Sequence, residues 1–369
     1  VMVAWDAGAD REGIKGRLGV QSLGARGDRY DLLAVPAGDE LAMCRRLRTE
    51  PGVAVAEPNY VIRTHHVPGS MRLAGRSVQY VPNDAGFAAV APNPLTYGAA
   101  WGLKAIKADQ AWDTTMGDSR IKVAVIDTGV DMAHPDLQAN LDTRGALNVL
   151  EAGRPVDDDF GHGTHVAGII ASVGDNQLGV LGVAPKTKVM PIRVLGVDGS
   201  GSVLDLVAAI DHAVAQGAKV INMSLGSPDR SQIEAEAIER AQAAGVVVVA
   251  AAGNEATTGN YLEYPASYPG VLSVGAVGPD MKRAPFSNFN SSVAIAAPGV
   301  DIFSTLPTRF GKTSPFGYLS GTSMAAPMVA GAAALVFAMH PNWTADQVIT
   351  KLKRSAKDLA VNDETPGFS

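Results

Sequence analysis

Three polar residues stand beside apolar segments of the chain, and together they could activate a nucleophile. Asp127 ends an apolar run, His162 lies between two glycines before an apolar segment, and Ser323 opens a long Ala-rich segment. A serine hydroxyl is a poor nucleophile until a base removes its proton, and a histidine base works best when a carboxylate fixes its tautomer. These residue types therefore predict a serine nucleophile, its general base and the acid that orients the base.

Each of these residues also has a simpler interpretation. Asp127 could merely cap the turn that follows it, and Ser323 could merely cap a helix. His162 and His165 share a helix face, so a metal pair is an alternative. The missing His-Glu-x-x-His arrangement and the lack of a third soft ligand argue against that alternative. We expect His165, which lies further into the apolar helix, to be a hydrogen-bonded core residue.

The elements that must position these residues show a regular alternation. From about Trp101 onward, short apolar runs alternate with helical patterns. This alternation predicts an α/β fold, a parallel sheet covered by helices on both faces. Ligand sites in such sheets lie at the carboxyl ends of the strands, which is where Asp127 falls. The expected strands are 121–126, 189–194, 220–223, 246–251, 271–277 and 293–296, and the expected helices are 203–216, 232–244 and 325–339.

Residues 1–65 have a pattern of their own. It predicts a small α+β domain of ferredoxin-like type, with helices on one face of its sheet. Cys44, the single cysteine, is expected in the core of this domain. Residues 66–100 are rich in Pro, Gly, Ser, Arg and Asn, which is typical of a linker followed by an extended arm. The expected strands are 1–5, 30–35, 53–56 and 60–62, and the expected helices are 11–18 and one that begins at Asp39 and Glu40.

Composition excludes several classes of protein. Because 46% of the residues are hydrophobic and only 18% are charged, the chain can bury a sizeable core, and disorder is excluded for most of it. The net charge of −6 gives no indication of a nucleic-acid partner. The apolar segment 324–339 is shorter than a membrane span, so we expect no membrane association.

The order and surroundings of the three residues resemble one family. The motifs Asp127-Thr-Gly, Gly161-His-Gly-Thr-His and Gly321-Thr-Ser-Met-Ala-Ala-Pro follow one another as in subtilisin-family (subtilase) serine endopeptidases, and residues 1–65 resemble the family's inhibitory propeptide. No Gly-x-Ser-x-Gly motif is present, which argues against an α/β-hydrolase. The resemblance implies that Ser323 attacks the scissile carbonyl, that His162 is general base and then acid, and that Asp127 orients His162.

The same resemblance implies further site residues. Asn254 matches the family's oxyanion-hole asparagine, which donates to the oxyanion together with the N–H of Ser323. Two glycine-containing segments match the edges between which a peptide substrate binds, and such binding reads main chain more than side chains. The residues implied for these edges are Gly199, Ser200, Gly201, Ser224, Leu225 and Gly226.

One glutamate departs from the pattern of relatives, and a second lies close to it. Glu263 stands at the base of the specificity pocket, where relatives commonly have a small residue, and Glu255 lies near the pocket's rim. These positions raise the hypothesis that the pocket accepts Lys, Arg or another polar side chain before the cleaved bond. Glu263 could instead be turned to solvent. Relatives also suggest a cis bond between Tyr264 and Pro265.

The resemblance also implies a structural calcium ion. Asp136 matches the family's calcium-binding carboxylate, and Asn176 matches a partner that adds a side-chain oxygen. The loop that carries Asn176 has one residue more than the common form. For Asp136 the alternative is a helix cap. The acidic run 157–159 is expected to be a solvated loop, although relatives of the thermitase type bind a second calcium nearby.

The organisation expected from these observations is that of a zymogen. Residues 1–65 form the inhibitory propeptide domain, residues 66–80 a linker with the processing region, and residues 81–369 the catalytic domain. Autocatalytic processing is expected soon after 62–65 or near 78–80. We expect a secreted or periplasmic monomer that acts on polypeptides, with its propeptide as inhibitor and folding aid. The resemblance implies that the propeptide packs its sheet against helices of the catalytic domain and that its C-terminal strand lies in the substrate cleft like a product. No signal peptide is visible in the sequence.

Overall fold

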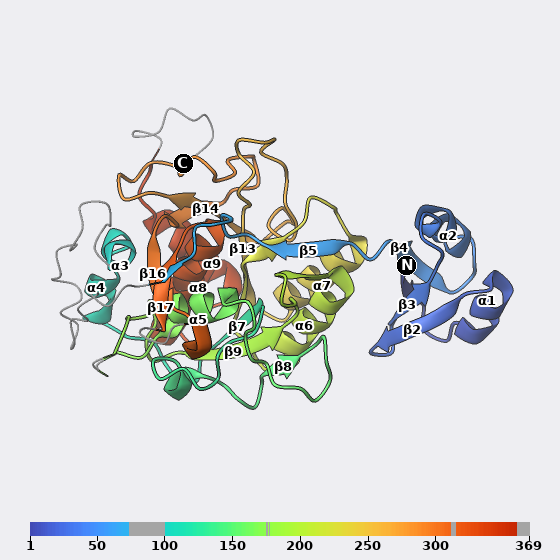
Figure 1. The fold of residues 1–369 in the computed structure, drawn as a ribbon, viewed down its shortest axis with the longest axis horizontal. Helices are drawn as coiled ribbons and strands as arrows, with labels where there is room; N and C mark the ends of the chain where they lie inside the picture. The colour runs from blue at the N-terminus through green and yellow to red at the C-terminus, as the bar shows by residue number, and fades with distance from the viewer. Residues whose placement is uncertain (74–99, 175, 177, 311–314, 360–369) are drawn as a thin grey trace.

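The computed structural model describes residues 1–73, 100–174, 176, 178–310 and 315–359. The expected processing region near 78–80 lies outside these residues. Within them, a small sheet near the N-terminus and a large α/β body are joined by one extended strand (Figure 1).

The large body is built on a seven-stranded sheet of order β15-β14-β13-β11-β7-β9-β8. All of its strand pairs are parallel, as the alternation of apolar strands and helices predicts. The two-residue strand β8 is too short for an apolar pattern to reveal it. The strands are β7 Lys122–Asp127, β8 Leu147–Asn148, β9 Lys188–Arg193, β11 Val220–Met223, β13 Val247–Ala251, β14 Leu272–Val277 and β15 Ile295–Pro298.

Helices cover both faces of this sheet. One face packs on α5 and α8, and the other on α6 and α7, because successive side chains of each strand point to opposite faces. Among the described residues, α8 is the helix apolar and long enough to cross a membrane, and 78% of it is buried inside the protein. The helices are α3 Trp101–Ala105, α4 Ala108–Trp112, α5 His162–Ala171, α6 Val203–Ala215, α7 Gln232–Ala243, α8 Thr322–Met339 and α9 Ala345–Ser355.

The N-terminal sheet has the antiparallel order β2-β3-β1-β4, which is the ferredoxin-like order. One of its faces packs on α1 and α2, and Cys44 of α2 is buried there as predicted. The other face packs on α6 and α7 of the large body. The elements are β1 Met2–Trp5, α1 Arg11–Leu18, β2 Gln21–Arg26, β3 Tyr30–Ala34, α2 Glu40–Leu47 and β4 Val53–Glu57.

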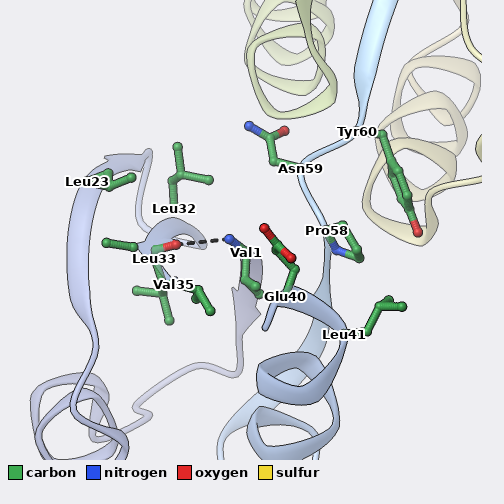
Figure 2. Close-up of a pocket in the computed structure, with 11 residues that line it drawn as sticks. Val1, Leu23, Leu32, Leu33, Val35, Glu40, Leu41, Pro58, Asn59 and Tyr60 are labelled. Carbon is green, nitrogen blue, oxygen red and sulfur yellow. Dashed lines mark hydrogen bonds between the residues drawn. The ribbon is translucent and has the colours of Figure 1, made fainter. Parts of the chain in front are cut away.

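A hollow of about 630 Å³ lies at the edge of the N-terminal domain. Figure 2 shows apolar side chains of β3 and α2 around it, together with the connection 58–60. The amino group of Val1 donates a hydrogen bond to the Leu33 carbonyl beside it. Its lining residues all belong to residues 1–60, so the hollow is separate from the polar cluster described below.

Two smaller sheets connect the parts of the chain. Strand β5 Val61–Thr64 lies between β10 Ser200–Ser202 and β12 Leu225–Gly226, antiparallel to both. After it, β6 Arg72–Leu73 pairs with β17 Phe316–Leu319, whose other neighbour is β16 Ile302–Thr305. The segment 61–73 therefore crosses the large body in contact with it at both ends.

Candidate active site

Asp127 and His162 meet at the carboxyl end of the large sheet. Asp127 is the last residue of β7, and His162 is the first residue of α5. The His162 Nδ1 atom lies 2.8 Å from one carboxylate oxygen of Asp127 and 3.0 Å from the other, and both side chains are fully buried. The carboxylate can therefore hold the imidazole with Nδ1 protonated and leave Nε2 free to accept a proton.

The turn before α5 is held by an acid that we did not expect to be buried. Asp158 is 1% exposed and accepts hydrogen bonds from the hydroxyls of Thr128 and Thr164. It also accepts three backbone N–H groups of residues 160–164. Burial raises the pKa of Asp158 although these donors oppose the shift. The expectation that 157–159 form a solvated loop was therefore wrong for Asp158, which fixes the start of the helix carrying His162.

Close packing of α5 against the β7 turn explains one of the glycines beside His162. A Cβ at Gly163 would collide with the Gly129 carbonyl and lie 3.1 Å from the Asp127 Cβ. His165, one turn further, is fully buried, and its Nε2 lies 3.0 Å from the Ile302 carbonyl. This confirms the expectation of a hydrogen-bonded core histidine. Burial and the neighbouring His162 lower the pKa of His165 to about 3, so it is neutral.

Ser323 lies in the first turn of α8, whose N-terminus points at the same region. Its hydroxyl donates to the Ser224 carbonyl at 3.0 Å, and its side chain is fully buried. The His162 Nε2 atom has no hydrogen-bond partner among the described residues. The Ser323 hydroxyl is therefore directed at the Ser224 carbonyl rather than at His162.

Asn254 follows β13 and faces the start of α8. Its Oδ1 accepts a hydrogen bond from the Thr322 N–H at 2.9 Å, which leaves its Nδ2 group as a donor. That group donates to the carbonyl of His65 at 2.7 Å. The N–H of Ser323 donates to the same carbonyl at 3.1 Å. Two donors therefore converge on one peptide oxygen, the arrangement that stabilises negative charge on a carbonyl under attack.

The segment that brings His65 to this point occupies the two edges predicted to bind peptide. Gly201 of β10 pairs with Ile62, and Gly226 of β12 pairs with Arg63. The backbone pairing continues past the start of β10, because the Thr64 N–H donates to the Gly199 carbonyl at 3.1 Å. Of the other predicted edge residues, Ser200 pairs with Arg63, Leu225 with Thr64, and the Ser224 carbonyl accepts the His65 N–H at 3.1 Å.

The peptide bond between His65 and His66 lies between the serine and the histidine. Ser323 donates its N–H to the His65 carbonyl, while the rings of His66 and His162 are 5.5 Å apart. A Cβ at Gly321 would lie 2.6 Å from the His65 oxygen, so only glycine leaves room for this chain. Burial and the nearby His162 lower the pKa of His66 to about 4, so its ring is neutral.

Glu255 and Glu263 surround the His65 side chain. Glu263 is 3% exposed, so the alternative that it turns to solvent was wrong. Its Oε2 lies 3.5 Å from the His65 Nε2. The bond between Tyr264 and Pro265, just after Glu263, is cis as expected.

Asp136 and Asn176 also meet, away from the serine. The Asn176 Nδ2 group donates to Asp136 at 2.7 Å, and the Val180 N–H donates to the other carboxylate oxygen at 2.9 Å. Burial raises the pKa of Asp136 to about 7, although these two donors oppose the shift. Both donors are uncharged, so a full negative charge on Asp136 lacks a cationic partner among them.

Some contributing residues were missed from the sequence. Thr322 belongs to a motif that we quoted, but its role in orienting Asn254 depends on packing between α8 and the β13 loop. Asp158 stands in the middle of an acidic run, a pattern that usually indicates exposure to solvent. Glu57, which binds the start of α7, acts between two parts of the chain that are far apart in sequence. None of these contacts leaves a local signal.

Comparison with known proteins assigns the chain to a family. Residues 118–368 match the model of the subtilase family. Subtilisin E of Bacillus subtilis (strain 168) is 44% identical over 261 residues, which are 70% of this chain and 66% of that protein. Subtilisin of Bacillus pumilus is also 44% identical over 261 residues, which are 92% of its length.

A solved structure agrees with this assignment. Fervidolysin from Fervidobacterium pennivorans, described as a keratinolytic enzyme related to subtilisin, superposes with a TM-score of 0.78 at 28% identity. The match covers 98% of this chain and 57% of that one. The chain thus spans just under two thirds of subtilisin E and a little over half of fervidolysin. On the sequence match and the fold together, the chain belongs to the subtilase family.

Proposed function

We propose that this protein is a subtilisin-like serine endopeptidase in its zymogen form, with residues 1–65 as inhibitory propeptide and His65–His66 as the bond that it cuts in itself. The observation that carries the proposal is the His65 carbonyl. It accepts hydrogen bonds from Asn254 and from the Ser323 N–H, at the end of a strand bound on both edges. The chain lies there as a substrate would.

The first half of the reaction follows from these positions. The Ser323 oxygen attacks the His65 carbonyl carbon while its proton passes to Nε2 of His162. Asp127 stabilises the resulting imidazolium. Asn254 and the Ser323 N–H hold the negative oxygen of the tetrahedral intermediate. His162 then gives its proton to the His66 nitrogen, the peptide bond breaks, and His65 is left as an ester on Ser323.

The second half restores the enzyme. Water gives a proton to His162 and attacks the ester carbonyl, and the same two donors again hold the oxyanion. The proton returns to the Ser323 oxygen as the ester bond breaks. His65 then ends in a carboxylate, and His66 begins the mature chain.

Contacts outside the cleft support the inhibitory role of residues 1–65. Glu57 accepts hydrogen bonds from backbone N–H groups at the start of α7, where the helix dipole favours a carboxylate. Arg26 pairs with Asp205 at 2.8 Å, and Arg29 pairs with Glu236 at 2.7 Å. These contacts and the shared apolar face would keep the domain bound after the cut, with β5 covering the cleft.

The test follows the full chain over time by intact mass, together with casein hydrolysis and labelling by a serine-directed fluorophosphonate. The expected result is a fragment of residues 1–65, a second fragment beginning at His66, and an adduct on Ser323 that stops casein hydrolysis. Cutting near 78–80 would contradict the processing site. A chain that frees residues 1–65 and never hydrolyses casein would be restricted to self-cleavage, and a chain that cuts nothing would be a binding protein; either result contradicts the endopeptidase.

Replacing Asn254 with alanine should slow self-processing by about 10²–10³-fold, the usual effect of losing one oxyanion donor. The change removes the 2.7 Å donor and leaves the Ser323 N–H in place, so some rate should remain. The measurement is the first-order rate of appearance of residues 1–65. Asn342→Ala, in an exposed turn before α9, serves as the control and should keep the wild-type rate. Equal rates for the two variants would remove Asn254 from the mechanism.

We also propose that Asp136 and Asn176 hold a structural calcium ion. A carboxylate and an amide oxygen are donors that suit this ion, and the ion would neutralise the buried charge of Asp136. The amide of Asn176 presents its NH₂ group to Asp136 here, whereas calcium requires its oxygen. When bound, the ion would stabilise the loop between α5 and β9.

Removing calcium with a chelator should lower the melting temperature of the mature enzyme by about 4 °C at pH 8, if free calcium was about 100-fold above its Kd. Asp136→Asn should abolish the dependence, while Asp280→Asn should keep it. The effect should be smaller at pH 5. Without calcium, folded Asp136 has a pKa of about 7 against the usual 3.8, so the folded state loses stability as the pH rises between these values. A chelator effect that is unchanged in Asp136→Asn would contradict this site.

Its relatives support two further inferences about the whole protein. The curated proteins that it matches include subtilisins, and we infer that this protein acts on polypeptides outside the cell. We also propose that the protein is a monomer, because the large body and residues 1–65 cover one another's apolar faces within one chain.

A further inference from the structure

The side chain of His65 is enclosed by two acids. It is 6% exposed, and its Nε2 lies 3.5 Å from the Glu263 carboxylate. One polar atom from each of His65, Glu255 and Glu263 lies within 4.8 Å of the other two. The pocket for the residue before the cleaved bond is therefore acidic.

The backbone around this pocket lets the acids approach. A Cβ at Gly253 would lie 2.6 Å from the Glu255 carboxylate and 2.8 Å from the Glu263 side chain. A Cβ at Gly226 would lie 2.5 Å from the His65 ring. Glycine at these two positions leaves space for both carboxylates and for the side chain that enters between them.

Neither carboxylate is neutralised by the rest of the protein as described. Glu255 accepts from its neighbour Asn254 and from Asn288, which are uncharged donors, and the ion pair found for Glu263 is with His65. A buried carboxylate without a cation is costly. Once residues 1–65 leave, an incoming substrate with a positive side chain would replace His65 as the partner.

We propose that Glu263 and Glu255 make this protease selective for a positively charged side chain before the cleaved bond, and that its own processing site uses this selectivity through His65. The inference rests on the proposed function, because it assigns a substrate class to the same site. It explains why a histidine, and not an apolar residue, lies in the pocket of the uncut chain.

The protonation of His65 agrees with this arrangement. Burial disfavours the charged ring, but the hydrogen bond and charge of Glu263 and the charge of Glu255 outweigh burial and raise the pKa of His65. The Ala251 carbonyl acts in the same direction. The partners of the His65 backbone are uncharged: the Ser224 carbonyl accepts its N–H, and the Ser323 N–H and the Asn254 amide donate to its carbonyl. His66, the remaining titratable neighbour, is directed to His162 and is neutral.

The first test measures kcat/KM of the mature enzyme on peptides that differ only in the residue before the cleaved bond: Lys, Arg, Gln or Leu. The better of Lys and Arg should exceed Leu by about 30-fold or more, the low end for a buried charge pair. Glu263→Gln and Glu255→Gln should each reduce this ratio by about tenfold. Glu239→Gln, which removes an exposed charge on α7, should leave the ratio unchanged.

The outcomes separate this inference from the function on which it rests. If Leu is cleaved as fast as Lys and Arg, the enzyme is a protease and the inference is overturned. If no peptide is cleaved after residues 1–65 have been released, the proposed endopeptidase function is contradicted, and the inference that rests on it falls with it. If the ratio stays high in Glu263→Gln and Glu255→Gln, the selectivity belongs to other residues and the assignment is overturned.

A second test needs no change in the pocket itself. The self-processing rates of the wild-type chain, His65→Lys and His65→Gln are followed from pH 5 to pH 9. The wild type should match His65→Lys at low pH and fall toward His65→Gln at high pH, because His65 loses its charge and lysine does not. The ratio of wild type to His65→Lys should drop about tenfold or more across this range. Effects of pH on the shared catalytic groups cancel in this ratio.

Two results of the second test would overturn the proposal. A constant ratio of wild type to His65→Lys from pH 5 to pH 9 would show that the charge of His65 does not matter. A requirement for zinc, seen as loss of processing with a chelator and recovery with Zn²⁺, would show that the three groups act as a metal site.

Discussion

Replacing Ser323 with alanine should stop self-processing and the hydrolysis of added polypeptides, with a loss of about 10⁶-fold, the size measured for the same change in subtilisin, a relative of this protein. The backbone N–H of Ser323 already holds the His65 carbonyl oxygen, so the Ser323 hydroxyl belongs to the residue that contacts the bond to be cut. Alanine keeps the N–H and removes only the attacking atom. The measurement is intact mass over time, with casein hydrolysis in parallel.

The variant should remain folded as one chain that retains residues 1–65. The Ser323 side chain makes a hydrogen bond to the Ser224 carbonyl, so its loss should change the melting temperature little. Ser355→Ala, near the end of α9, is the matched control and should be processed like the wild type. Appearance of the 1–65 fragment from Ser323→Ala at the wild-type rate would show that another nucleophile cuts the bond.

Asp127→Asn is expected to slow self-processing by about 10⁴-fold, as the equivalent change does in another serine protease. Asparagine can still accept the Thr128 N–H, which donates to Asp127 at 2.7 Å. Its NH₂ group would then face Nδ1 of His162, so the ring would carry its proton on Nε2 and could not accept one from Ser323. The loss thus reports the tautomer of His162 rather than a missing contact with substrate.

The readout for this variant is again the first-order rate of self-processing, which involves no substrate binding step. Asp346→Asn, in the exposed first turn of α9, controls for the loss of a negative charge and should behave like the wild type. A fall of less than about tenfold in Asp127→Asn would mean that His162 does not depend on Asp127. A drop as deep as that of Ser323→Ala would mean that the fold of the site has been lost.

The fold of the large body followed from the sequence to within a few residues. Strand β11 matches the expected 220–223, and α7 ends at Ala243 against an expected 244. Strand β11 is a buried, mostly apolar run and α7 has a helical period of apolar residues, so the composition of each segment defines it. Strand β2 was missed because its residues are largely exposed and its pairing is irregular between Ser22 and Gly24. Its position depends on β3 more than on its own side chains.

The candidate site likewise contains residues that the sequence predicts and contacts that only the fold reveals. The residue types at Asp127, His162 and Ser323 could be recognised because each stands beside a distinctive apolar or glycine-rich segment. The expected last strand of the N-terminal domain, 60–62, is β5 at 61–64. Its place between the two edges was implied by the family resemblance and agrees with its pairing, although its own residues do not indicate it. The contact of His65 with Glu263 joins positions almost two hundred residues apart. Only the folded chain shows that the processing site and the acidic pocket fit one another.

The two attachments of residues 1–65 have a kinetic consequence. The sheet face on α6 and α7 and the strand β5 in the cleft are joined by the connection 58–60. After the first cut they act as one bivalent ligand, and the short connection keeps the effective concentration of β5 at the cleft in about the millimolar range. A cut within 58–60 would separate them and weaken retention by about 10²–10⁴-fold. Any molecule freed in this way could cut others, so activity should rise after a lag and then accelerate.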